Sequence, residues 1–362
     1  MMKNKLALFG AGLVVLLILP LFAQSFADGW VRIMDLSLLY MLLALGLNIV
    51  VGYAGLLDLG YVAFYAVGAY MFGLLASPHL TESFDWFKNA FAHGLHAPIW
   101  LVIPLGAAVA GTFGVLLGAP TLRLRGDYLA IVTLGFGEII RVFLNNLDAP
   151  VNITNGPKGL DTIDSIHIFG MDLGKPHAFL GIEFHAVSQY FYLFVLLVIV
   201  AVVICSRLER SRIGRAWMAI REDEIAAKAM GINTRNLKLL AFGMGATFGG
   251  VSGVMFGAFQ GFVSPESFSL DESIMIVAMV VVGGIGHIPG VLLGALLLSA
   301  LPEVLRYVAG PLQEATGGRL DAAILRQLMI ALAMIGVMLS RPRGLWPSPE
   351  HGKAAPAAVP VK

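Results

Sequence analysis

The amino-acid sequence predicts an all-α integral membrane protein: a polytopic bundle of about ten transmembrane helices (roughly eight to ten), with both termini in the cytoplasm. Hydrophobic residues make up 58% of the 362 residues and charged residues only 13%, whereas charged residues are about a quarter of a soluble domain. Several apolar runs approach the ~20 residues that a helix needs to cross a bilayer, and strand-like alternation is absent. The chain therefore uses lipid as its solvent. Its formal net charge of +1 does not indicate a nucleic-acid partner.

About ten apolar segments follow one another along the chain. The first resembles a signal peptide, because Lys3 and Lys5 precede an apolar run. That run exceeds the apolar core of a cleaved signal, roughly 7–15 residues, so an uncleaved anchor is the favoured interpretation. The short segment at 273–285 ends among glycines, and a re-entrant segment is the alternative to a span there. The predicted segments are residues 6–23, 33–51, 59–76, 98–119, 128–147, 189–206, 239–260, 273–285, 289–308 and 322–340.

The positions of the basic residues set the predicted topology. With the N-terminus inside, about two thirds of the 24 lysines and arginines fall in cytoplasmic segments, as the positive-inside rule expects. Residues 207–238 are therefore predicted to form a cytoplasmic loop, and the polar residues 148–188 a long periplasmic loop. That outer loop is interpreted either as a cap or landing site for an extracytoplasmic protein, or as a solvated connector. Residues 1–346 form one transmembrane domain, and the tail at 347–362, rich in Ala and Pro, is predicted to be disordered in the cytoplasm.

The loop at 207–238 contains the sequence E-I-A-A-K-A-M-G, from Glu224 to Gly231. Its small residues Ala226 and Ala227 predict a short helix that docks on a soluble partner. A helix with small side chains allows close approach of the partner surface.

The span that follows this loop carries a glycine ridge. Four residues turn an α-helix by about 400°, so residues repeated at this spacing form one slowly drifting stripe. Such stripes let helix backbones approach closely. Static close packing and a moving gate helix are the two interpretations of the ridge. Its members are Gly245, Gly249, Gly253, Gly257 and Gly261.

Two glycine-rich sequences interrupt apolar runs, at residues 52–60 and 283–290. They suggest a weak internal duplication with broken helices along a pathway. Asp58 is interpreted either as a pathway residue or as an aspartate near the cytoplasmic surface. The polar residues at helical depth that are candidates to line a route are Asn48, Tyr53, Asp58, Thr133 and Gln260.

Motifs for catalysis and nucleotide binding do not occur in the sequence. Cys205 is the single cysteine, which excludes an internal disulfide or a cysteine metal cluster. The sequence G-x-x-x-x-G-K-[ST] for phosphate binding is absent, as are H-E-x-x-H and G-x-S-x-G. We therefore expect no enzyme activity, cofactor or metal site in this chain, and any ATP hydrolysis must come from a partner.

Five sequence runs carry a resemblance to a known family. They are G-L-N-I-V-V-G-Y-A-G-L-L-D-L-G (46–60), L-R-L-R-G-D-Y-L-A-I-V-T-L (122–134), N-G-P-K-G-L (155–160), G-R-A-W-M-A-I-R-E-D-E-I-A-A-K-A-M-G-I-N (214–233) and R-P-R-G-L-W (341–346). In these runs the chain resembles the permease subunits of branched-chain amino-acid ABC importers, and most of all the longer of the two paired permeases. The runs extend over nearly the whole chain in the family's order.

The resemblance implies a bacterial inner-membrane assembly. Its expected partners are a second permease subunit in a heterodimer, two cytoplasmic ATPase subunits that bind the ATP, and an extracytoplasmic substrate-binding protein. Leucine, isoleucine or valine is the implied substrate. Urea or short amides are the alternative within the class. An ion-coupled secondary transporter is a further alternative, although most spans lack the carboxylates that it would need.

The resemblance also implies a docking element for the ATPases. The family's signature E-A-A-x-x-x-G is relaxed here, since Ile225 separates the glutamate from the two alanines. The residues that correspond to the docking element, with the arginines expected to meet acidic partners, are Glu224, Ala226, Ala227, Gly231, Arg215 and Arg221.

Overall fold

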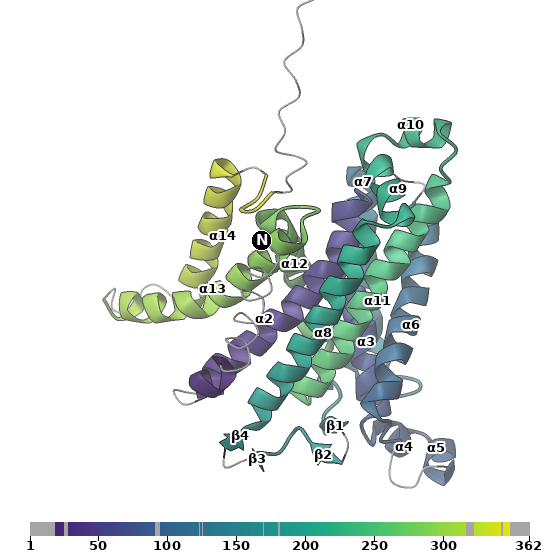
Figure 1. Cartoon of the computed structure of the whole chain (residues 1–362). Helices are drawn as coiled ribbons and strands as arrows, with labels where there is room; N and C mark the ends of the chain where they lie inside the picture. Colours follow the sequence, from purple (N-terminus) through teal and green to yellow (C-terminus); the bar gives the residue numbers. More distant parts are fainter. Residues whose placement is uncertain are drawn as a thin grey trace, which may run out of the picture.

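The computed structural model describes residues 19–24, 28–90, 95–122, 124, 126–168, 170–179, 182–315, 322–341 and 343–347 (Figure 1). Long helices run past one another through the body of the molecule. The short helix α10 (Glu224–Ala229) protrudes beyond one end, and two β-hairpins lie at the opposite end. We call these ends the α10 end and the hairpin end.

Nine of the ten predicted apolar segments fall on helices in the described part of the chain, and the segment at 6–23 lies mostly outside it. The predicted bounds differ from the helix bounds by a few residues. The helices are α2 (Asp28–Leu47), continued by the π-helical η1 (Asn48–Tyr53), α3 (Val62–Leu75), α6 (Ile99–Thr121), α7 (Asp127–Asn146), α8 (Ala186–Glu209), α11 (Thr234–Gln260), α12 (Leu270–Gly283), α13 (Ile288–Ala315) and α14 (Ala322–Ser340).

Among the described residues, five stretches are long and apolar enough to cross a membrane: α2 with η1, α6, α8, α11 and the Ile288–Leu305 part of α13. The helix α3 and residues Gln327–Ser340 of α14 are shorter apolar helices. These lengths and compositions support an all-α membrane protein. The number of crossings and the sides on which the termini lie stay predictions.

The helix α11 lies at the centre and contacts α2, η1, α3 and α6. Its glycines pack directly on neighbouring helices: a Cβ at Gly253 would lie 2.1 Å from the Tyr65 carbonyl oxygen of α3. A Cβ at Gly245 would lie 2.4 Å from Cγ2 of Val50, and one at Gly249 3.0 Å from Cβ of Phe64. The ridge is thus closely packed, as in the first of its two interpretations, and a sliding gate helix stays a hypothesis.

Gly261 does not belong to the ridge, contrary to the prediction. The helix ends at Gln260, and Gly261 has a left-handed φ of 66° with open space where a Cβ would lie. Its N–H donates to the Gly257 carbonyl at 3.0 Å, which makes it a C-cap. The sequence interpretation also missed a close contact of α11 with α6, since a Cβ at Gly250 would lie 2.5 Å from the Gly106 carbonyl oxygen.

The loops at the hairpin end are folded and attached to the helices. Leu160 and Val263 exchange backbone hydrogen bonds of 2.8 and 2.9 Å, which fix the loop at 148–188 to the end of α11. Asn155 supports this turn by donating from Nδ2 to the Gly159 carbonyl at 2.8 Å. The small elements here are α4 (His79–Ser83), α5 (Asp85–Ala90), η2 (Gly156–Lys158), β1 (His167–Ile168), β2 (Met171–Asp172), β3 (His177–Phe179), β4 (Ile182–Phe184) and η3 (Pro265–Phe268).

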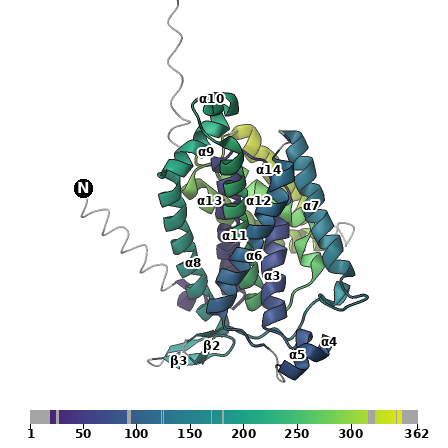
Figure 2. The same cartoon turned by 90° about the vertical axis from the view of Figure 1, so that its right-hand side faces the viewer.

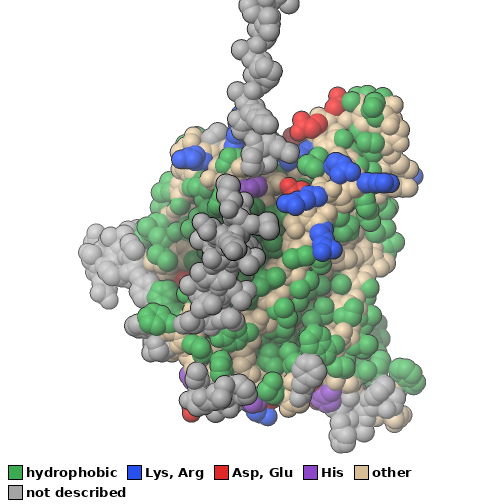
Figure 3. Space-filling view, in the orientation of Figure 1, with side chains coloured by type: hydrophobic (Ala, Val, Ile, Leu, Met, Phe, Trp, Pro, Cys, Tyr) green, Lys and Arg blue, Asp and Glu red, His purple; other side chains and the backbone are tan. Residues whose placement is uncertain are grey.

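The surface is divided by residue type. Hydrophobic side chains cover the middle of the molecule in Figure 3, while Lys and Arg side chains gather toward the α10 end. Large apolar residues such as Leu116, Ile131 and Leu196 are exposed on α6, α7 and α8. A soluble monomer rarely exposes such a continuous apolar area, so this band fits contact with lipid.

Candidate functional site

The charged segment folds into α9 (Arg212–Glu222) and α10 at the α10 end (Figure 2). Each helix begins at a polar N-cap. The Ser211 Oγ accepts from the Gly214 N–H at 3.1 Å. The Asp223 carboxylate accepts from the N–H groups of Ile225 and Ala226, at 2.8 and 3.0 Å. Ser and Asp favour this position because their side-chain oxygens satisfy the free N–H groups of the first turn.

The two helices and the start of α11 form one block, residues 212–238. Trp217 is fully buried, and its Nε1 donates to the Leu237 carbonyl at 2.7 Å. The Glu224 carboxylate pairs with Nζ of Lys238 at 2.7 Å and with Nζ of Lys228 at 3.0 Å. Burial raises the pKa of Glu224, but the hydrogen bonds and charges of Lys238 and Lys228 outweigh it and lower the pKa to about 2. We call these residues the coupling block.

This ion pairing predicts a pH dependence of the coupling block. The pKa of Glu224 lies below its ordinary value of 4.5, so the stabilisation is present above pH 4.5 and is lost as the pH falls toward about 2. A spin label at position 225 should therefore gain mobility between these pH values. With Glu224→Gln it should already be mobile at pH 7 and change little with pH. Glu222→Gln, at an exposed position, is the control. Equal label mobility in the Glu224→Gln and Glu222→Gln proteins would show that the Glu224 ion pairs are unimportant.

The predicted docking residues divide into an outer and an inner set. Ala226 and Gly231 are exposed, and Gly231 closes α10 with a left-handed φ of 82°. Ala227 is only 4% exposed and packs inside the coupling block. The predicted small-residue docking face is thus only half exposed, because residues 226 and 227 are about 100° apart on a helix and face different sides.

Sequence reasoning missed two large, exposed apolar residues, one on α10 and one at its C-cap. Ile225 is 70% exposed and Met230 83% exposed. Ile225 is the insertion by which the sequence departs from the family signature, and Met230 stands beside the closing glycine. Two large apolar side chains on a charged, protruding helix were the signal for a docking surface.

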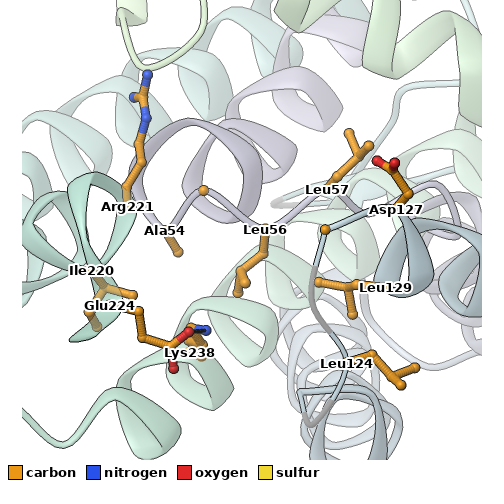
Figure 4. A pocket seen from close by; sticks show the side chains of 12 residues that line it. Ala54, Leu56, Leu57, Leu124, Asp127, Leu129, Ile220, Arg221, Glu224 and Lys238 are labelled. Atoms are coloured by element: carbon orange, nitrogen blue, oxygen red, sulfur yellow. Dashed lines mark hydrogen bonds and ion pairs between the residues drawn. The ribbon is translucent and has the colours of Figure 1, made fainter. Parts of the chain in front are cut away.

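The two predicted arginines point in different directions. Arg215 is exposed, and its Nη1 donates to the Arg210 carbonyl at 2.8 Å within the same segment. Arg221 is partly buried, and its Nη1 donates to the Gly52 carbonyl at 2.5 Å in η1. Its side chain extends away from Glu224 and Lys238 in Figure 4. Arg221 therefore faces the helical body, and its contact with an acidic partner stays a prediction.

The two glycine-rich interruptions of the sequence lie together at the α10 end. The Asn48 Oδ1 in η1 accepts from the Gly286 N–H at 2.9 Å, in the turn between α12 and α13. The C-terminal segment joins them, since the Trp346 N–H donates to the Gly283 carbonyl at 3.1 Å. The His287 Nδ1 is 2.9 Å from the Trp346 carbonyl oxygen. Three sequence-distant segments therefore meet in one place.

Four of the five candidate pathway residues are buried. Asn48 and Tyr53 are buried in η1. Asp58 is 1% exposed, not at the surface, and accepts from the Gly60 N–H at 2.9 Å. Thr133 is buried beside it and accepts from the Leu59 N–H at 3.0 Å.

Two side chains lie apart from this group. Gln260 is at the far end of α11, where it accepts a hydrogen bond from Arg32. Asp35 of α2, which the sequence interpretation overlooked, is 0% exposed, and its oxygens have no hydrogen-bond partner among the described residues. A carboxylate in a membrane helix is a candidate functional group by default.

A cavity of about 280 Å³ lies between the coupling block, the loop after η1 and the start of α7 (Figure 4). Glu224 and Lys238 stand together on one wall. The residues that line it are Ala54, Gly55, Leu56, Leu57, Leu124, Gly126, Asp127, Leu129, Ile220, Arg221, Glu224 and Lys238. Over the described residues, no group of three or more His, Cys, Asp or Glu side chains is placed to hold a metal ion.

An apolar helical body with a basic, protruding helical block at one end is the architecture of a membrane transport subunit. The chain belongs to the family of permease components of branched-chain amino acid transport systems, whose sequence pattern matches residues 29–338. The members of this family are transport permeases, and the chain is accordingly not an enzyme.

Relatives support this assignment over most of the chain. The high-affinity branched-chain amino acid transport system permease protein LivM of Escherichia coli is 39% identical over 355 residues, 95% of this chain and 75% of the relative. LivM of Salmonella typhimurium is 40% identical over 331 residues, 88% of this chain and 70% of the relative. The corresponding LivH of Escherichia coli is 24% identical over 318 residues, 87% of this chain and 93% of the relative. No solved structure matches the chain.

Proposed function

We propose that the chain is the membrane-spanning permease subunit of an ATP-binding-cassette importer and forms part of the translocation path for leucine, isoleucine and valine. The observation that carries the proposal is the exposed apolar pair on α10, at the basic end of a chain about 40% identical to two LivM permeases. The chain lacks a nucleotide-binding motif, so the ATP is bound by partner subunits. The branched-chain substrates are inferred from the two LivM relatives, which are branched-chain amino acid transport permeases.

The proposed location is the bacterial inner membrane, with the α10 end in the cytoplasm. The concentration of Lys and Arg at this end supports that orientation. The hairpin end then faces the periplasm, where its folded loops offer a landing surface for an extracytoplasmic substrate-binding protein. The tail at 347–362 is proposed to be disordered in the cytoplasm, and all of it beyond residue 347 lies outside the described residues.

Two cytoplasmic ATPase subunits are the proposed partners of the permease pair, and one of them docks on α10. Ile225 and Met230 would insert into an apolar groove of the ATPase, with Ala226 between them allowing close approach. Arg215 lies at the rim, where it can meet acidic side chains. Glu224 and Ala227 support this surface from inside. The second permease is a related subunit, as LivH is to LivM, so a heterodimer is expected.

Uptake by the reconstituted importer tests this function. We expect accumulation of radiolabelled leucine, isoleucine or valine in vesicles that contain the permease pair, the ATPases and ATP, with the loaded binding protein outside. Uptake of urea or a short amide in their place would move the assignment to the alternative substrate class. Accumulation driven by a proton or sodium gradient without ATP would refute the importer and would favour an ion-coupled transporter, for which Asp35 is the candidate carboxylate.

A further inference from the structure

Arg221 joins the coupling block to two glycine-rich segments of the helical body. Its Nη1 donates to the Gly52 carbonyl at 2.5 Å. A Cβ at Gly286 would lie 2.9 Å from this nitrogen, and a Cβ at Gly55 would lie 2.9 Å from Cγ of Arg221. The arginine therefore lies in a slot whose walls are glycine backbone, with no room for side chains.

The Gly52 carbonyl is an acceptor at the end of a helix. The last carbonyls of a helix have no donor in a following turn, and η1 ends at Tyr53. The next N–H groups go elsewhere, from Ala54 to the Ile49 carbonyl and from Leu56 to the Val50 carbonyl. A π-helical turn is itself an irregularity that is frequent at functional sites. A charged guanidinium is a strong donor for such a carbonyl, so Arg221 completes the end of η1.

The helix η1, which Arg221 contacts, is itself bonded to the second glycine-rich interruption through Asn48. The Asn48 Oδ1 accepts from the Gly286 N–H at 2.9 Å, so η1 and the turn at 284–287 are linked directly beneath Arg221. The C-terminal segment holds the other side of this turn, because the Leu345 N–H donates to the Val282 carbonyl at 2.8 Å. A displacement of Arg221 therefore acts on two interrupted helices at once.

The coupling block has the stiffness and the space to move as a unit. Its inner contacts, from Trp217 to Leu237 and from Glu224 to Lys238, join α9, α10 and the start of α11. Beside the contact of Arg221 with Gly55, a cavity of about 280 Å³ lies between the block, the start of α7 and the loop after η1. Because interiors are otherwise close-packed, such a space beside a stiff block allows the block to shift and to carry Arg221 with it.

We propose that Arg221 is a positioning residue that transmits movement of the coupling block to η1 and to the turn between α12 and α13. This inference rests on the proposed function, since the ATPases that dock on α10 supply the movement. Neither interruption needs to contact the ATPase. Binding energy gained at α10 changes the two broken helix ends through one side chain.

The test compares Arg221→Met and Arg221→Lys with a matched control in the complete importer, reconstituted with its partner subunits. Arg235→Met is the control, because Arg235 is an exposed arginine of the same block. Two quantities are measured: solute taken up per ATP hydrolysed, and the hydrogen exchange of residues 224–231, 52–60 and 284–287 with and without a trapped ATP state. The first range reports docking, and the other two report transmission.

We expect the wild type and Arg235→Met to change exchange in all three ranges. Arg221→Met should keep the change at 224–231, lose it at 52–60 and 284–287, and transport about 10-fold less solute per ATP, within the usual strength of coupling between sites. Arg221→Lys keeps the charge and one donor group and should recover part of this loss. If Arg221→Met fails to assemble, the same two quantities measured for Arg221→Lys and for Arg235→Met provide the test.

Two results would overturn the inference, and they are distinguishable. Wild-type transport per ATP, with unchanged exchange responses in the Arg221 variants, would remove Arg221 from transmission while leaving docking intact. Absence of any protection at 224–231 in the wild type would instead remove the docking on α10, and the inference with it. A merely structural role would reduce the yield of complex without altering transport per ATP.

Discussion

Replacing Gly253 with leucine is expected to prevent α11 from packing on α3. Even a Cβ at this position would lie 2.1 Å from the Tyr65 carbonyl oxygen, 2.6 Å from the Ala69 nitrogen and 2.9 Å from Cα of Gly68. These are backbone atoms, so no side chain can rotate away and the two helices must separate. Overpacking a core usually costs about 1–3 kcal/mol and sometimes more, and here the strain falls on the central helix. We therefore expect a large fall in Tm and in the yield of monodisperse protein in detergent.

Gly253→Ala separates this effect from side-chain size, and Gly135→Ala on α7 is the matched control. Nothing lies within 4 Å of a Cβ at Gly135, and alanine favours a helix by up to about 1 kcal/mol over glycine. The control should be neutral or stabilising, while Gly253→Ala should already be destabilised. A Gly253→Leu protein with normal Tm would contradict the close contact of α11 with α3. Normal transport by that protein would also exclude the ridge as a moving gate.

The second large effect is expected from charging the tip of α10. Ile225→Asp and Met230→Asp place carboxylates where the proposed ATPase groove receives apolar side chains. Truncation of a central interface residue costs about 2 kcal/mol or more, roughly 30-fold in affinity. The double variant should therefore lose co-purification of the ATPase subunits and ATP-dependent uptake. Because both side chains are largely exposed, the permease itself should keep its yield and Tm.

Ala227→Leu provides the contrasting variant on the same helix. Ala227 is buried inside the coupling block, so a larger side chain there should disturb the block's internal packing and lower the Tm, with the tip residues unchanged in identity. Glu222→Gln, at an exposed position of α9, should leave the Tm and the recruitment of the ATPase unchanged. Normal ATPase recruitment by the double Asp variant would refute docking on α10.

The candidate site could be predicted only in part, because the sequence of a segment does not determine which way each of its side chains points in the folded protein. The position of the charged segment and the short helix around Ala226 follow from local sequence, since N-caps, charges and small residues act over one or two turns. Which of Ala226 and Ala227 faces outward depends on how α10 packs on α9 and α11. Arg221 carries the same local signal as Arg215, yet one contacts Gly52, 169 residues away in the sequence, and the other its own segment.

The ridge on α11 shows the same division. Its four-residue spacing in the sequence places Gly245, Gly249, Gly253 and Gly257 on one stripe, and the structure brings that stripe against α2, η1 and α3. Gly261 continues the spacing but lies beyond the helix, because a left-handed residue ends α11 at that point. Spacing alone does not state where a helix stops.

The sequence by itself determined that this protein is a helical membrane protein and where most of its helices lie, because apolar composition and 3.6-residue geometry are local properties that lipid makes obligatory. Only the tertiary structure decided which glycines touch, which arginine turns inward, and that residues 48–53, 284–287 and 343–347 meet beneath the coupling block. Those outcomes depend on contacts between segments far apart in the chain. The pattern within one segment does not determine them.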